Sequence, residues 1–179
     1  MKKLIILLVI VCLWSCNAED MISRNYSCRF LLDAQLHPTS KIVTAVNSPG
    51  YFVWVSFQRI NGIVHFYVHP VDNSGDEEVI LTTDRENQIE YMLGAYNGII
   101  IGCTNFNGLA AYDQQCPNCL EQTGFPKYPL TGVEKRPMQV ECANCKRVYS
   151  LETGSSETGG TPLYRYAVAI EGYQIRAYN

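Results

Sequence analysis

The amino-acid sequence predicts an all-β fold of short strands and many turns, with a metal-binding site formed by two cysteine-bearing turns. Strand-forming residues are abundant, among them 12 Tyr, and they occur in short runs separated by turn residues. Asn-Gly dipeptides, the strongest short signal of a hairpin, occur at 61–62 and 107–108. Two Cys-x-x-Cys pairs, Cys116–Cys119 and Cys142–Cys145, stand 22 residues apart and predict the metal-binding loops.

Residues 1–15 indicate a lipoprotein signal peptide. Two lysines precede an apolar run over 4–13, which as a helix would be about 15 Å long, about half the thickness of a bilayer's hydrocarbon core. The run ends in Leu-Trp-Ser before Cys16, which is similar to a bacterial lipobox. The resemblance implies cleavage before Cys16, acylation of its sulfur (palmitate, for example), and anchoring to a membrane without a spanning helix. An ordinary signal peptide with an incidental Cys16 is the alternative.

Residues 16–27 are expected to form a lipidated tether, followed by one domain over 28–179. Asn17-Ala18-Glu19-Asp20 is similar to the acidic tetrapeptides that follow the lipidated cysteine in surface-exported lipoproteins of Bacteroidota. The resemblance implies a protein of the bacterial cell envelope, held at the outer membrane on either its periplasmic or its surface face. The formal net charge of -3 and the pI near 5.6, with no run of Lys or Arg, predict no nucleic-acid partner.

The first half of the domain is expected to begin with a hairpin. Aromatic and β-branched residues run through 51–60 and 63–69, with an Asn-Gly turn between them, and Pro70 ends the second strand. Three elements follow in order: a short strand over 79–81, one helical turn within 84–91, and a buried strand over 99–101 that ends at Cys103.

The second half is expected to alternate strands with cysteine-bearing turns. The second Asn-Gly turn leads through a strand over 109–113 into Cys116. Residues 121–138 are rich in Gly, Pro and Tyr without helical periodicity, so we expect a loop there. The remaining segments are a strand over 139–141, a strand within 146–151, a polar loop over 155–162, and a closing hairpin of 163–170 and 174–178 around Glu171-Gly172.

The paired cysteines predict a metal site with four thiolate ligands, Cys116, Cys119, Cys142 and Cys145. The two residues inside each pair turn the backbone tightly enough for both sulfurs to reach one ion, and Pro and Asn suit such turns. The alternatives are two disulfides or two redox-active pairs. A disulfide inside a pair would close a very small loop. Thiol–disulfide exchange requires a pair at a helix start with a lowered thiol pKa, which neither pair indicates.

Two further cysteines, Cys28 and Cys103, remain once Cys12 has left with the signal peptide. In an oxidising envelope they could pair in a disulfide, provided that their Cα atoms lie within about 7 Å of each other. Equally, each could be a small buried apolar residue. The sequence leaves both alternatives open.

The three histidines do not complete a catalytic or metal-binding group. His65 and His69 fall on one predicted strand, about 13 Å apart, and nothing in the sequence brings His37 near the cysteines. No Ser-His-Asp or Cys-His set can be assembled. We therefore expect a protein without catalytic activity.

The order of motifs resembles the Rieske iron–sulfur domain. Ala111–Pro117 is similar to its aromatic-Asp-x-x-Cys-Pro turn, and Val148–Gly154 is similar to the aromatic-x-Leu-x-Thr-Gly strand that follows its second loop. The resemblance is strongest over 98–179, with 28–97 supplying the other strands, and the whole chain is similar to Rieske-like lipoproteins of Bacteroidota. It implies a Rieske-like sandwich or barrel with its metal-binding loops within 111–151.

The sequence departs from the Rieske pattern at the ligands. A Rieske cluster takes two histidines on its outer iron, but Cys145 stands where one would be, and Asn118 or Cys119 where the other would be. Two metals remain. Four thiolates could hold a structural Zn²⁺ with every position closed, or a [2Fe–2S] cluster with a potential near about −400 mV. The even spacing and the lost histidines favour zinc, and the family resemblance favours iron.

The predicted function follows from these features. We expect an envelope lipoprotein that binds one metal, zinc before iron, and acts as a binding or scaffold module for an unidentified envelope protein. A closed four-cysteine zinc site leaves no position for water, so it predicts no catalysis. The alternative is a ferredoxin-like electron carrier with a [2Fe–2S] cluster and a redox partner.

Overall fold

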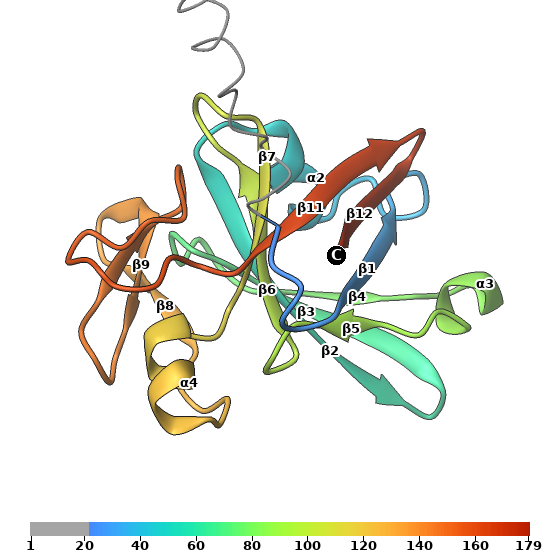
Figure 1. Ribbon diagram of the computed structural model, residues 1–179. Coiled ribbons are helices and arrows are strands. Elements are labelled where there is room, and N and C mark those ends of the chain that lie inside the picture. The colour runs from blue at the N-terminus through green and yellow to red at the C-terminus, as the bar shows by residue number, and fades with distance from the viewer. Residues whose placement is uncertain (1–21) are drawn as a thin grey trace, which may run out of the picture.

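Residues 22–179 are described by the computed structural model, and they form two antiparallel sheets of unequal size (Figure 1). The large sheet has nine strands in the order β4-β3-β2-β6-β7-β11-β12-β1-β5, and the small sheet has the order β10-β9-β8. The fold is therefore all-β, as predicted. The large sheet consists of β1 (Cys28–Asp33), β2 (Tyr51–Ile60), β3 (Ile63–Pro70), β4 (Glu77–Ile80), β5 (Met92–Leu93), β6 (Gly98–Cys103), β7 (Leu109–Asp113), β11 (Arg165–Glu171) and β12 (Gln174–Tyr178). The small sheet consists of β8 (Leu130–Val133), β9 (Arg136–Cys142) and β10 (Val148–Ser150).

The predicted hairpin at the start of the large sheet is confirmed. β2 and β3 pair antiparallel up to the Ile60–Ile63 pair. Asn61 and Gly62 form the turn, with φ values of 51° and 86° in the left-handed region that Asn and Gly tolerate best. On its other side β2 pairs with β6, so the predicted buried strand lies in the interior of the sheet.

Between residues 22 and 179, three short helices interrupt the strands. α3 (Asp84–Asn87) is the predicted single turn, and Thr83 and Glu86 begin it with a capping box. The sequence pattern does not predict α2 (Lys41–Asn47), and it indicates only a turn at α4 (Pro117–Thr123). Both helices have seven residues, which is too short for a helical periodicity to show in the sequence.

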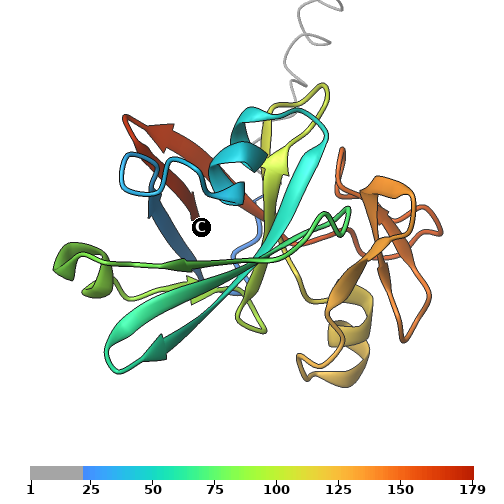
Figure 2. The same ribbon diagram turned by 180° about the vertical axis from the view of Figure 1, so that it is seen from behind.

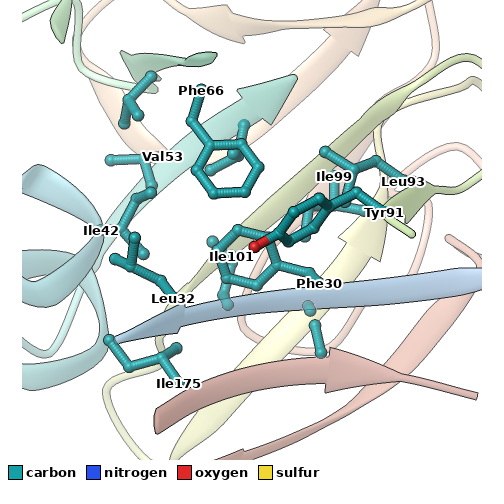
Figure 3. Close-up of a cluster of buried hydrophobic side chains, with 14 of the residues drawn as sticks. Phe30, Leu32, Ile42, Val53, Phe66, Tyr91, Leu93, Ile99, Ile101 and Ile175 are labelled. Atoms are coloured by element: carbon teal, nitrogen blue, oxygen red, sulfur yellow. The ribbon is translucent and has the colours of Figure 1, made fainter. Parts of the chain in front are cut away.

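The large sheet curls around the main hydrophobic core (Figure 3). Side chains from β1, β2, β3, β6, β12 and α2 converge there. Phe30 contacts Phe66 at a ring-centroid distance of 5.3 Å, and Phe66 contacts Tyr91 edge-on at 5.1 Å. Full burial of one such large apolar side chain contributes about 1.5–3 kcal/mol. This core therefore stabilises the large sheet.

A second core joins the two sheets. Phe52 and Ile100, from the face of the large sheet opposite the first core, pack with Val140 and Tyr149 of the small sheet. Figures 1 and 2 show the small sheet and α4 together on one side of the large sheet. Three of the predicted ligand cysteines belong to this second core. The metal site therefore lies where the two sheets meet.

Two close contacts fix the small sheet on the large one. A Cβ atom at Gly132 of β8 would lie 2.2 Å from the carbonyl oxygen of Val71, which follows β3, so only glycine permits this approach. The carboxylate of Glu152, just after β10, accepts hydrogen bonds from the backbone N–H groups of Asn105 and Phe106 at 2.8 and 3.1 Å. These contacts tie the small sheet to two separate turns of the large sheet.

The disulfide between Cys28 and Cys103, which the sequence left open, is not formed, and both thiols are free. Cys28 lies near Asp113, which pairs with Ile99 at the start of β6. Cys103 stands at the other end of β6, four residues or about 13 Å away along the strand. Cys28 is instead a core residue, and burial raises the pKa of its thiol to about 12.

The predicted signal peptide and the lipidation site Cys16 lie outside the described residues, as does the first part of the tether. None of the helices between residues 22 and 179 has the length and apolar character that a membrane-spanning helix requires. The described chain starts at Ile22, which forms a parallel bridge with Arg165 at the start of β11.

Candidate metal centre

The first pair of cysteines stands at the beginning of a helix. Cys116 is the N-cap of α4, and Pro117 is its first residue. Proline suits this position because its φ is already helical and its missing N–H would have no partner there. Cys119 follows in the same turn, and Gly124 ends the helix with a φ of 71°. A short helix therefore replaces the simple turn that the sequence predicted here.

The second pair of cysteines stands at the turn between β9 and β10. Cys142 is the last residue of β9 and pairs with Leu130 of β8. The chain then reverses, and the N–H of Lys146 donates to the carbonyl oxygen of Cys142 at 2.9 Å. Cys145 lies within this turn. The two pairs thus come from a helix start and a hairpin turn.

The four cysteines predicted as ligands meet at one point. Their sulfur atoms all lie within 4.8 Å of one another. The Sγ atoms of Cys116 and Cys145 are 3.7 Å apart, and those of Cys119 and Cys142 are 3.6 Å apart. Within residues 22–179 this is the one group of three or more Cys, His, Asp or Glu side chains with ligand atoms this close. The arrangement can hold a metal ion.

Burial and hydrogen bonds act in opposite directions on the thiol pKa values of Cys116, Cys142 and Cys145. Cys116, Cys119 and Cys142 are buried, and Cys145 is half-buried. Burial raises the pKa of Cys116 and of Cys142 above the ordinary value of a thiol. The pKa of Cys145 is lowered to about 7, because hydrogen bonds from Arg147 and the neighbouring thiols outweigh the opposing effect of its partial burial. A bound cation would stabilise all four thiolates.

Backbone N–H groups within each cysteine turn point toward the sulfurs. These bonds run from Cys119 to the sulfur of Cys116, from Asn144 and Cys145 to that of Cys142, and from Arg147 to that of Cys145. Such bonds stabilise the charged form of a sulfur ligand. Both turns therefore have a backbone arranged for thiolates.

The neighbours Asn118 and Cys119 have different roles in the first pair. Cys119 belongs to the sulfur cluster. The buried side chain of Asn118 instead donates to the Tyr149 hydroxyl oxygen at 2.7 Å and to the Thr161 carbonyl oxygen at 3.0 Å. Asn118 is therefore not a ligand. It is connected to the sulfur of Cys116 only through the hydroxyl of Tyr149.

Side chains of the small sheet complete the surroundings of the sulfurs. The Tyr149 hydroxyl lies 3.4 Å from the Sγ atom of Cys116, and the amide nitrogen of Asn144 donates to the Sγ atom of Cys119 at 3.3 Å. Sequence reasoning did not identify these two residues as parts of the site. Tyr149 is the aromatic residue of the strand that follows the second pair, and its contact with Cys116 arises only in the folded chain.

The polar loop over 155–162 covers α4 beside the first pair. The backbone N–H of Thr161 donates to the side-chain oxygen of Asn118 at 3.2 Å, and its hydroxyl donates to Glu121 at 2.7 Å. The hydroxyl of Tyr164 also reaches Glu121, at 3.4 Å. The predicted loop is confirmed, and its role is to hold α4 from the side of β11.

Asp113 fixes the junction between β7 and the first cysteine pair. Its buried carboxylate accepts hydrogen bonds from the N–H groups of Ala95 and Gln115, both at 2.8 Å, and from the Tyr166 hydroxyl at 2.7 Å. Burial raises the pKa of this carboxyl, while the three hydrogen bonds act to lower it. Gly94 leaves space for the group, since a Cβ atom there would lie 2.4 Å from its Oδ2 atom.

The histidines have partners far from the sulfur cluster. Each pairs with a carboxylate: His37 with Glu86 at 2.8 Å, His65 with Glu78 at 2.8 Å, and His69 with Asp76 at 2.9 Å. All of these residues lie around the large sheet. No histidine therefore joins the sulfur cluster, whose ligand atoms all come from cysteine.

The expectation that neither pair begins a helix was wrong for the first pair. Cys116 occupies a helix start, a position that lowers the pKa of a reactive thiol in exchange enzymes. Here burial raises the pKa of Cys116 instead, and its sulfur is fully covered. The geometry thus meets one requirement of thiol–disulfide exchange and lacks the other.

Neither a scan against protein-family models nor searches of curated proteins and of solved structures found a match to this chain.

Proposed function

We propose that the chain is an envelope lipoprotein whose four cysteines bind one structural zinc ion, and that it acts as a non-catalytic binding or scaffold module. The observation that carries the zinc assignment is the compactness of the sulfur cluster. Four thiolates around one zinc ion lie about 2.3 Å from the metal, which makes the edge of the tetrahedron about 3.8 Å. Two of the sulfur separations are 3.6 and 3.7 Å, and no pair exceeds 4.8 Å.

A [2Fe–2S] cluster would need a more open arrangement. It divides the four thiolates between two irons, two on each. Thiolates on different irons are then farther apart than thiolates that share one ion. A cluster with every sulfur pair within 4.8 Å therefore favours a single ion. The lack of histidine among the clustered ligands also favours zinc over a Rieske centre.

A zinc ion at this point would stabilise the junction of the two sheets. Cys116 and Cys119 belong to the segment that leaves the large sheet, and Cys142 and Cys145 belong to the small sheet. Binding energy gained only in the folded state adds directly to stability. With all four positions taken by sulfur, the ion has no site for water or substrate, so its role is structural.

The envelope location and the family assignment rest on the sequence. The lipobox-like end of the signal peptide supports lipidation of Cys16 and a membrane anchor, and the acidic tetrapeptide after it supports a place at the outer membrane. The Tyr112-Asp113 turn before Cys116 and the strand after Cys145 support descent from a Rieske-like lipoprotein. In this proposal the histidine ligands were exchanged for cysteine, and the electron-transfer cluster for a structural ion.

X-ray absorption at the zinc edge of the zinc-loaded protein tests the ligand set. We expect four sulfur scatterers at about 2.3 Å and no nitrogen scatterer. Nitrogen in the first shell, or fewer than four sulfurs, would refute the site as proposed. Labelling of the cells with radioactive palmitate tests the anchor separately. The label should appear on the wild-type chain and not on a Cys16→Ala variant.

A further inference from the structure

The two cysteine pairs share the pattern Cys-x-Asn-Cys, yet their asparagines make different contacts. Asn144 in the second pair donates directly to a sulfur, that of Cys119. Asn118 in the first pair contacts no sulfur and instead holds the hydroxyl of Tyr149, which touches the sulfur of Cys116. Asn118 is also 93% buried, since only 7% of its surface is exposed. Burial of a side-chain amide is unfavourable unless hydrogen bonds compensate for it, so the contacts of Asn118 indicate its role.

The hydrogen bonds of Asn118 fix the direction of the next one. Its side-chain oxygen accepts from the N–H of Thr161, so the amide orientation is determined. Its nitrogen uses one proton for the Thr161 carbonyl and the other for the oxygen of Tyr149. The Tyr149 oxygen therefore accepts, and its own proton is directed to its remaining partner, the Cys116 sulfur at 3.4 Å.

The backbone above Asn118 is shaped to hold this amide in place. A Cβ atom at Gly160 would lie 2.4 Å from the Asn118 oxygen, and Gly160 has a φ of +101°, which favours glycine. Thr161 is fixed in turn by Glu121 of α4. The loop over 155–162 and the first cysteine pair are thus linked through one side chain.

We propose that Asn118 is a positioning residue of the metal centre. It directs the Tyr149 proton onto the Cys116 sulfur and holds the loop over 155–162 against α4. The inference deepens the proposed four-thiolate site, on which it rests. A hydrogen bond to a ligating thiolate withdraws charge from the metal–sulfur bond. Loss of such outer contacts commonly weakens metal binding ten- to a hundredfold.

Cobalt(II) bound in place of zinc provides the readout, because its sulfur-to-metal charge-transfer band reports the charge on the thiolates. Asn118→Asp keeps the shape and the acceptor for Thr161, but it removes the donor. The Tyr149 proton should then turn from the sulfur to the new carboxylate. We expect a shifted band and a release of cobalt to a chelator that is about tenfold faster.

A double-mutant cycle separates this relay from a general effect of the added charge. In a Tyr149→Phe background the hydroxyl is absent, so Asn118→Asp should lose the part of its effect that equals the effect of Tyr149→Phe. Asn144→Asp is the matched control, since it adds the same charge beside a sulfur without contacting Tyr149. Its effect should be the same in both backgrounds.

Two results would overturn the inference. Full additivity of Asn118→Asp and Tyr149→Phe would show that no relay exists, and so would an unchanged cobalt band in Asn118→Asp. If circular dichroism shows that this variant is unfolded, Asn118→Ala takes its place in the same cycle with the same expectation of non-additivity. Failure of the wild-type chain to bind either cobalt or zinc would refute the proposed four-thiolate site itself, and the inference with it.

Discussion

The sulfur atoms of Cys116 and Cys145 lie 3.7 Å apart, although 29 positions separate the two residues in the chain. One stands at the start of α4 and the other at the turn between β9 and β10. Their contact therefore closes the segment that contains α4 and the strands β8 and β9 of the small sheet. A metal bound here would fix that segment at both ends, and several measurable consequences follow from this closure.

Replacement of Cys142 by serine should destabilise the protein strongly. Cys142 is fully buried in the core between the two sheets, and its loss would remove a ligand and leave a hydroxyl among apolar side chains. We expect the free energy of unfolding to fall by about 4 kcal/mol or more, a size typical of the loss of a structural metal. Thermal and urea unfolding of the metal-loaded protein measure this change.

Cys103→Ser serves as the control for the same chemical change outside the site. Cys103 is only half-buried and its thiol contacts a backbone carbonyl oxygen, which a hydroxyl can also reach. Cys103→Ser should lower the free energy of unfolding by less than about 1 kcal/mol. If Cys142→Ser unfolded at the same temperature as the wild type, the four cysteines would not share a stabilising ion.

Removal of the metal should loosen only one part of the molecule. The core of the large sheet contains none of the ligand cysteines, whereas the core between the sheets contains three of them. Treatment with a chelator should therefore raise hydrogen exchange in β8, β9, β10 and α4 and leave β2 and β3 protected. Uniform deprotection of both sheets would contradict a local role for the ion.

Gly94→Ala should destabilise the junction below the site. The new Cβ atom would lie 2.4 Å from Oδ2 of Asp113 and 2.8 Å from the Tyr166 hydroxyl, and φ at this position is +68°. Backbone strain and the displaced hydrogen bonds together predict that the free energy of unfolding falls by about 2–4 kcal/mol. Gly108→Ala has a similar φ of +74° with nothing within 4 Å, so it should show the strain alone, about 1 kcal/mol. Equal losses in the two variants would refute the steric explanation.

Tyr166→Phe should destabilise the protein in a pH-dependent way. The Tyr166 hydroxyl donates to the buried Asp113 carboxylate and thereby lowers a pKa that burial raises. Without it the folded-state pKa of Asp113 rises further above the unfolded value, so stability is lost as the pH increases through that range. The loss in free energy of unfolding caused by Tyr166→Phe should approach about 1.5–3 kcal/mol at neutral pH and become smaller as the pH is lowered. Urea unfolding at several pH values measures it, and a penalty independent of pH would contradict the assigned bond.

Local signals predicted much of this fold because they act over a few residues. The Asn61-Gly62 turn, the strand around Ile100 and the closing hairpin at Gly172 all have backbone requirements that the sequence displays directly. The cysteine spacing likewise indicated which four sulfurs would meet. These features depend on neighbours along the chain, and a single sequence carries that information.

Features that depend on distant contacts could not be predicted in this way. α4 is stabilised by its packing and by Glu121, which binds Thr161 across the loop. The function of Asn118 arises because β10 brings Tyr149 beside it. The separation of Cys28 from Cys103 follows from the position of the strands in the large sheet. Each of these relationships joins residues that lie far apart in the sequence.

The most direct test of the proposed zinc site is a determination of metal and acid-labile sulfide per chain, with a visible spectrum, on protein purified without oxygen. We predict about one zinc per chain, no sulfide and no visible absorbance, as expected for four thiolates around one closed ion. One iron without sulfide would keep the four-cysteine site but contradict zinc. About two irons and two sulfides per chain, with charge-transfer bands, would contradict the account and identify an electron carrier instead.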